Sequence, residues 1–127
     1  MTDRRAEGLE VFKELMPGIM PDNVDSLRDG GFAQELGELS LDNVFGSLWT
    51  RTGLGRRERS LATLGALIAM RAVDELRLHM PIALRNGLTV EEIEEVVYHL
   101  TGYAGFPAAN AARRVGREVL PQPERAR

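Results

Sequence analysis

The feature of this sequence that most constrains its fold is the helical spacing of its apolar residues. This spacing continues along almost the whole chain. Apolar residues recur at helical intervals within 56–70, and small residues such as Ala62, Gly65 and Ala66 stand between them. A helix that is apolar nearly all round is normally packed on several sides, and small residues let another helix come close. No segment shows a strand pattern. The sequence therefore predicts an all-α protein.

Start and stop signals divide the chain into helices. Thr89 followed by Glu92 predicts a capping box, and Pro107 suits the first turn of the last helix. Pro81 falls inside a predicted helix, where it removes one backbone hydrogen bond and favours a kink. The predicted helices are 6–16, one or two short helices within 22–37, 40–49 with Ser40 as N-cap, 56–70, 73–86, 89–101 and 107–119.

Composition excludes several classes of function. The chain has 127 residues, the length of about one domain, and a net charge of −3 without a basic stripe, so no nucleic-acid partner is expected. It has no cysteine, which excludes disulfides, thiolate catalysis and cysteine-bound zinc. Its longest apolar stretch falls far short of the roughly 20 residues of a membrane span. We expect a soluble, cytoplasmic protein that binds no membrane.

The segment AVDELRLHMPIALRNG contains an acid and an imidazole four residues apart, Glu75 and His79. This spacing brings both side chains to one face of a helix, close enough to share a proton or a ligand. The alternative is a buried pair that joins two helices or two subunits. A metal site built from these two residues and His99 is possible but lacks a convincing arrangement of the third ligand, so no metal is expected.

Several stretches together resemble the carboxymuconolactone decarboxylase family, and its decarboxylase branch most closely. They are LWTRTGLGRRERSLATLGALIAM and DELRLHMPIALRNGLTVEEIEEVVYHLTGYAGFPAANAA, within about residues 38–119. The resemblance implies a helical domain of the alkylhydroperoxidase-like type, with six to seven helices, assembled as a homo-oligomer, either a hexamer or a trimer. It also implies one domain overall, with an N-terminal helical segment over 1–37, a core over 38–120 and a flexible tail over 121–127.

The related peroxidase branch of this family has two cysteines on the helix that carries the histidine. Their positions correspond to Ala72 and Glu75, so thiol-based peroxide reduction is excluded here. The resemblance instead implies a cofactor-free lyase of aromatic catabolism and the β-ketoadipate pathway. Such an enzyme converts γ-carboxymuconolactone, a dicarboxylate lactone, to the β-ketoadipate enol-lactone. His79 would then be the general acid, with Glu75 orienting the imidazole and raising its pKa.

Five further residues are candidates for substrate binding, each with a structural alternative. Arg51 suits a bidentate clamp on a carboxylate, or is a surface arginine, and Trp49 lines the pocket or packs in the core. His99 is a second acid or a hydrogen-bond donor, or is a core or interface residue. Tyr103 donates to the lactone oxygen or anchors a helix end. The turn at Gly105 binds an oxyanion at the start of the last helix, or is a plain corner.

Two other functions stay open at this point. One is a family member recruited to another keto acid or lactone, for example in polyketide tailoring. The other is a non-catalytic oligomeric binding protein that kept the fold. In none of these cases does the sequence call for an organic cofactor.

Overall fold

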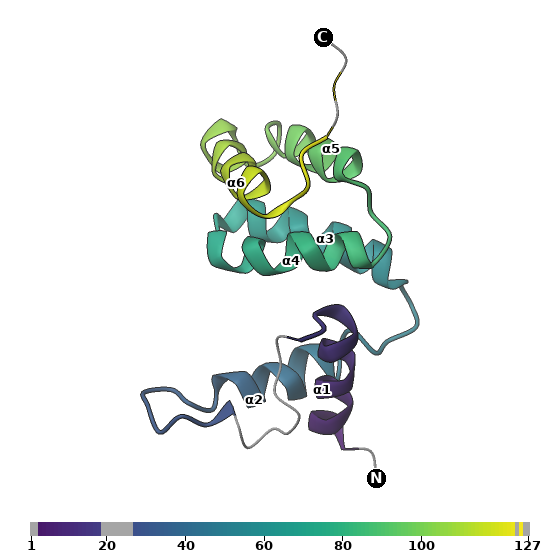
Figure 1. The fold of residues 1–127 in the computed structure, drawn as a ribbon, viewed down its shortest axis with the longest axis vertical. Helices are drawn as coiled ribbons and strands as arrows, with labels where there is room; N and C mark the ends of the chain where they lie inside the picture. Colours follow the sequence, from purple (N-terminus) through teal and green to yellow (C-terminus); the bar gives the residue numbers. More distant parts are fainter. Residues whose placement is uncertain (1–2, 19–26, 124, 126–127) are drawn as a thin grey trace. The chain divides into compact units, whose positions relative to one another are not determined.

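The computed structural model describes residues 3–18, 27–123 and 125, which form six α-helices, one π-helical segment and no strand (Figure 1). The all-α prediction is confirmed. Contacts divide the chain into two compact units, Met1–Leu54 and Gly55–Arg127, called here the first and the second unit. The division predicted from the sequence, with a core over 38–120 and a flexible tail, stays a prediction.

The first unit begins with α1 (Arg4–Leu15), which the Asp3 carboxylate caps by accepting hydrogen bonds from the first backbone amides. The predicted helix over 6–16 is confirmed. It packs against the π-helical segment η2 (Leu41–Phe45). An aromatic cluster fills this contact: the rings of Phe12 and Phe45 lie 4.8 Å apart edge to face, and Trp49 stacks on Phe45 at 6.3 Å. Edge-to-face and stacked pairs add to the energy of plain burial.

The predicted N-cap at Ser40 is wrong. Helix α2 (Leu36–Ser40) starts one turn earlier, Ser40 has helical dihedrals, and its side chain makes no capping hydrogen bond before the chain continues into η2. Of the short helices predicted within 22–37, residues 22–26 lie outside the described residues, and 28–35 are turn or irregular. Gly30 and Ala33 have φ of 78° and 58°, and such left-handed residues interrupt a right-handed helix.

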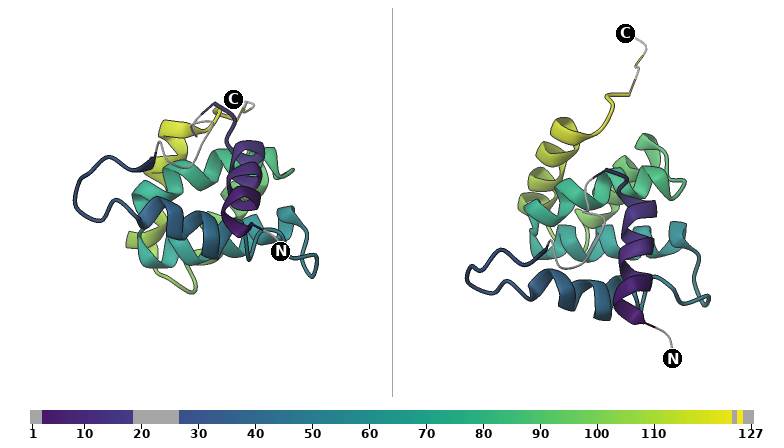
Figure 2. Two further views of the ribbon diagram at one scale, coloured as in Figure 1. Left: turned by 90° about the horizontal axis from the view of Figure 1, so that it is seen from below. Right: turned by 60° about the horizontal axis from the view of Figure 1, so that its bottom comes forward.

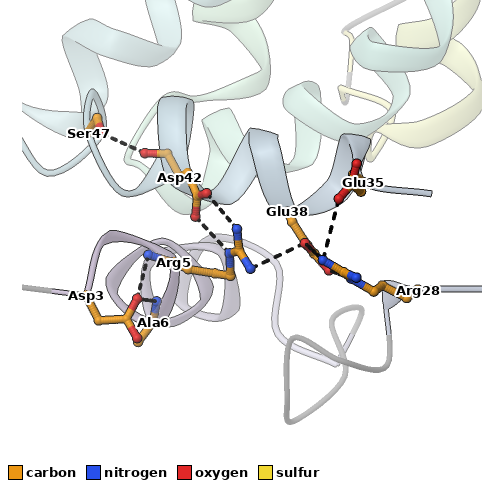
Figure 3. A network of polar contacts seen from close by, with 8 residues as sticks. All are labelled: Asp3, Arg5, Ala6, Arg28, Glu35, Glu38, Asp42 and Ser47. Carbon is orange, nitrogen blue, oxygen red and sulfur yellow. Dashed lines mark hydrogen bonds and ion pairs between the residues drawn. The ribbon is translucent and has the colours of Figure 1, made fainter. Parts of the chain in front are cut away.

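A network of carboxylates and guanidinium groups joins α1 to α2 and η2 (Figure 3). Glu38, only 2% exposed, lies between Arg28 and Arg5, and Arg5 also donates two hydrogen bonds to Asp42, at 3.0 and 2.9 Å. The hydrogen bond from Arg28 lowers the pKa of Glu38, and the one from Arg5 lowers the pKa of Asp42. A buried carboxylate is tolerated here because two cations compensate its desolvation.

The second unit consists of two helix hairpins. Helices α3 (Arg56–Met70) and α4 (Val73–Arg85) form one layer, and α5 (Val90–Leu100) and α6 (Phe106–Val119) form the other (Figures 1 and 2). The four predicted helices over this region are confirmed. The layers meet in one apolar core, whose members are Leu64, Ile68, Leu76, Met80, Ala83, Leu88, Ile93, Ala108, Ala112 and Val115.

The helix boundaries of the second unit follow the sequence signals. Thr89 and Glu92 form the predicted capping box, Gly87 ends the preceding turn with a φ of 102°, and Pro107 lies in the first turn of α6. Helix α4 runs through Pro81 without ending. Within the described ranges, no helix has the length and apolar character needed to cross a membrane.

Candidate active site

His79 is a buried residue of α4. It is 7% exposed and lies in the half of the helix that also buries Met80, Ile82 and Ala83. Glu75, one turn earlier, is on the same side, and its Oε2 lies 3.9 Å from His79 Nε2. The pair predicted from the spacing is therefore present. The two side chains differ in environment, because that of Glu75 is 60% exposed and that of His79 only 9%.

The expected effect of Glu75 on His79 is wrong in direction: the pKa of His79 is lowered, not raised, and the cause is burial. An exposed carboxylate is screened by water, and 3.9 Å is too long for a hydrogen bond. Desolvation of the imidazolium therefore exceeds the attraction of Glu75. Burial therefore favours the neutral form of the imidazole, and a negative charge that came close would favour the protonated form.

This lowered pKa predicts how the stability of the protein changes with pH. The folded state holds the His79 proton less tightly than the unfolded state, whose ordinary pKa is 6.5. The contribution of His79 to the free energy of unfolding is therefore complete above that value and is lost as pH falls through it towards the folded pKa. We expect urea midpoints at pH 7.5 and 5.5 to differ more for wild type than for His79→Gln. Equal differences would contradict the burial of a neutral imidazole.

The three candidates near the turn between α5 and α6 lie close together. The rings of His99 and Tyr103 are 5.0 Å apart, and both side chains are exposed, Tyr103 by 81%. A core role for His99 is therefore wrong. Gly105 has a φ of 90° and begins α6, whose first turn contains Pro107. This turn presents an imidazole and a phenol to the surface, and their roles towards a substrate stay predictions.

Trp49 and Arg51 belong to the first unit. Trp49 is 6% exposed and stacks on Phe45, so it contributes to the aromatic core of that unit. Arg51 is exposed and follows the turn after Trp49, with its backbone amide donating to the Leu48 carbonyl at 3.1 Å. Their place in the site stays a prediction.

A cavity in the second unit is lined by none of the predicted site residues. It has a volume of about 450 Å³ and lies within the second unit, among α4, α5, α6 and the residues after α6. Two of its lining residues, Arg113 and Arg117, were missed by the sequence analysis. Their signal was a pair of arginines four apart on an amphipathic helix. No group of three or more His, Asp or Glu side chains suited to a metal ion occurs in the part of the chain described.

The sequence model of the carboxymuconolactone decarboxylase family matches residues 34–118. The chain belongs to the carboxymuconolactone decarboxylase family. The match covers all four helices of the second unit nearly to the end of α6, together with α2 and η2 of the first, so both His79 and Arg51 fall within it.

Individual family members extend this similarity over most of the chain. The 4-carboxymuconolactone decarboxylase of Acinetobacter baylyi is 37% identical over 92% of this chain and 87% of that protein. The nitrosuccinic acid decarboxylase npaB of Metarhizium robertsii is 36% identical over 90% of this chain and 79% of that protein. An uncharacterized 15.0 kDa protein of Paracoccus denitrificans is 33% identical over 62% of this chain and 60% of that protein. Two of these three relatives are named as decarboxylases.

Proposed function

We propose that this protein is a cofactor-free decarboxylase of a carboxylated lactone such as γ-carboxymuconolactone, which it converts to CO2 and the β-ketoadipate enol-lactone. The observation that carries the proposal is the 37% identity to a 4-carboxymuconolactone decarboxylase over 92% of the chain. The similarity to a nitrosuccinic acid decarboxylase supports the same type of reaction. These relatives favour neither a role in polyketide tailoring nor that of a non-catalytic oligomeric binding protein.

The reaction breaks the bond between the carboxylate carbon and the ring. The electron pair of that bond moves through the conjugated double bond to the lactone oxygen, and a dienolate forms as CO2 leaves. A proton is then added to carbon. The lactone itself accepts the electrons, so the protein has to bind two carboxylates, place the departing one in an apolar environment and deliver one proton.

His79 is the proposed proton donor, and its lowered pKa specifies when it is charged. The imidazole is neutral in the free protein because it is buried. A bound di-anion raises the pKa of a nearby imidazole, so substrate binding is coupled to uptake of a proton. Glu75, 3.9 Å away and 60% exposed, connects the buried imidazole to solvent and is proposed to resupply that proton. Substrate binding would thus favour the charged, proton-donating form of His79.

The remaining candidates are proposed to hold the substrate. The guanidinium of Arg51 suits a bidentate bond to a carboxylate, so Arg51 is proposed to bind a substrate carboxylate, and Trp49 is proposed to contact the substrate. His99 and Tyr103, with rings 5.0 Å apart, are proposed to donate hydrogen bonds to the lactone oxygen. The backbone at Gly105 opens α6, where the positive end of the helix dipole favours an oxyanion.

We further propose a homo-oligomer, a hexamer or a trimer, in the cytoplasm. Large apolar side chains on the second unit support an assembly, since Met70, Tyr98, Tyr103 and Phe106 are 56–81% exposed. Solvent-exposed groups of this kind mark interaction surfaces when they are contiguous. Light scattering at micromolar concentration measures the oligomeric state. A stable monomer would contradict the proposed assembly.

The direct test of the proposed function is CO2 release by the purified protein. We expect turnover of γ-carboxymuconolactone in the presence of EDTA, without added nucleotide or organic cofactor, because the substrate supplies its own electron sink. Nitrosuccinate, which loses CO2 to leave a carbanion delocalised onto the nitro group, is the comparison substrate. If the protein turns over nitrosuccinate but not the lactone, nitrosuccinate replaces the lactone as the proposed substrate. If it turns over neither compound, the proposed function is contradicted.

A further inference from the structure

The cavity of about 450 Å³ in the second unit has the composition of a ligand site. Its floor is apolar and consists of side chains from three helices, among them Met80, Ile93, Val97 and Ala112. Its volume lies within the range of pockets that bind small molecules, roughly 300–1,000 Å³. The site would suit a ligand with an apolar body larger than a few atoms.

Two cationic side chains also line this cavity. Arg113 and Arg117 both line the cavity and lie four residues apart on α6, so they project from one side of the helix. Like charges at this spacing repel each other. Within residues 3–18, 27–123 and 125, neither guanidinium is engaged by a carboxylate. An anion placed between the two would remove the repulsion and accept hydrogen bonds from both.

Described residues after α6, among them Gln122 and Arg125, also line the cavity. The Gln122 side-chain amide donates hydrogen bonds to the backbone carbonyls of Leu120, at 2.8 Å, and Arg117, at 3.3 Å. Arg125 pairs with Glu94 of α5, so this segment is joined to both helices of the second hairpin. The pairing also neutralises Glu94, the acid that lines the cavity. Among the described lining residues, the charge that remains is therefore positive.

We propose that this cavity binds a small organic carboxylate with an apolar body, through Arg113 and Arg117. The apolar floor takes the body of the ligand, and the two guanidinium groups take its carboxylate by charge-assisted hydrogen bonds. The site does not include His79 or any other residue proposed for decarboxylation, and its ligand is bound without being transformed.

Calorimetric titration with 4-phenylbutyrate tests the proposal, with the neutral 4-phenylbutanamide as the matched ligand. We expect one molecule of the acid per chain and at least about tenfold weaker binding of the amide, because the amide cannot form charge-assisted hydrogen bonds. The double variant Arg113→Gln/Arg117→Gln should lose at least about tenfold in affinity for the acid. Equal affinities for acid and amide, or no binding of the acid, would overturn the inference.

The control variant is Arg114→Gln, which removes the same charge from the same helix at a position that does not line the cavity. It should bind 4-phenylbutyrate within about twofold of wild type, whereas a loss equal to that of the double variant would show a general charge effect and reject the site. His79→Gln should also bind as wild type does, and loss of binding there would place the ligand in the decarboxylation site instead. Light scattering during the titration shows whether the subunits stay together. If the acid binds only as subunits dissociate, the cavity is a contact between copies of the chain, and the proposal is overturned.

Discussion

Replacing His79 by Gln is expected to lower kcat on γ-carboxymuconolactone by about 10²–10⁴, the usual contribution of a positioned general acid. Glutamine has a similar size and keeps a hydrogen-bonding end, but it cannot supply a proton to the dienolate carbon. The imidazole is buried, and the acidic side chain on α4 within one turn of it is that of Glu75. We therefore expect no other described side chain of α4 to take over the proton delivery. Initial rates of CO2 release at saturating substrate measure the effect.

The comparison variant is His99→Gln, the same substitution at the other histidine of the chain, which is exposed. His99 is proposed to donate a hydrogen bond to the lactone oxygen, and glutamine can still donate one, so His99→Gln should lower kcat far less than His79→Gln does. The thermal midpoint of each variant shows whether the fold is kept. If His79→Gln is folded and loses less than about threefold in kcat, His79 does not deliver the proton, although the family assignment is unaffected.

The pH profiles sharpen this test. Burial holds the pKa of free His79 below 6.5, so kcat/KM, which reports the free protein, should already decline as pH rises through a value under 6.5. A bound di-anion raises that pKa, so kcat should persist to higher pH than kcat/KM. The decline of kcat and the decline of kcat/KM with rising pH should both be absent in His79→Gln. If kcat and kcat/KM decline through the same pH, substrate binding does not raise the pKa of the imidazole.

Much of the fold could be predicted because its local signals agree with its packing. Thr89, Glu92, Gly87 and Pro107 each fix a helix boundary by backbone chemistry that needs no partner, and the structure has all of these boundaries. Ser40 failed as a signal because a serine caps a helix only where the chain enters it, and the entry at Leu36 carries no capping residue. A capping residue type is therefore a weaker signal than a complete capping box.

The candidate site could be predicted only in part. Helical spacing was enough to predict that Glu75 and His79 approach each other, since a rigid helix fixes that distance. It was not enough to predict the pKa, because desolvation depends on which helices cover the imidazole and on whether the carboxylate faces water. The arginine pair at 113 and 117 was missed for the same reason: only the packing of three helices shows that these residues border a cavity.

Adding one methyl group to Gly8 or Gly46 is expected to destabilise the first unit strongly. A Cβ at Gly8 would overlap the backbone carbonyl of Leu41, and one at Gly46 would overlap the carbonyl of Arg4, so α1 and η2 approach at glycine on both sides. Backbone atoms cannot move aside as a side-chain end can. Overpacking of this kind reduces the free energy of unfolding by about 1–3 kcal/mol or more, for Gly8→Ala and for Gly46→Ala. Urea unfolding followed by the fluorescence of the single tryptophan, Trp49, which stacks on Phe45 in this unit, measures it.

Gly65→Ala is the matched control, because Gly65 lies inside α3 and its Cβ would meet no described atom within 4 Å apart from its own stretch of helix backbone. Alanine is a better helix former than glycine by up to about 1 kcal/mol, so this variant should be as stable as wild type or more stable. The same methyl group thus has opposite effects, and the sign depends on whether a backbone carbonyl occupies the space. Gly8→Ala and Gly46→Ala proteins within about 0.5 kcal/mol of wild type would show that α1 and η2 do not approach this closely, since so small a change is typical of substitutions away from packed contacts.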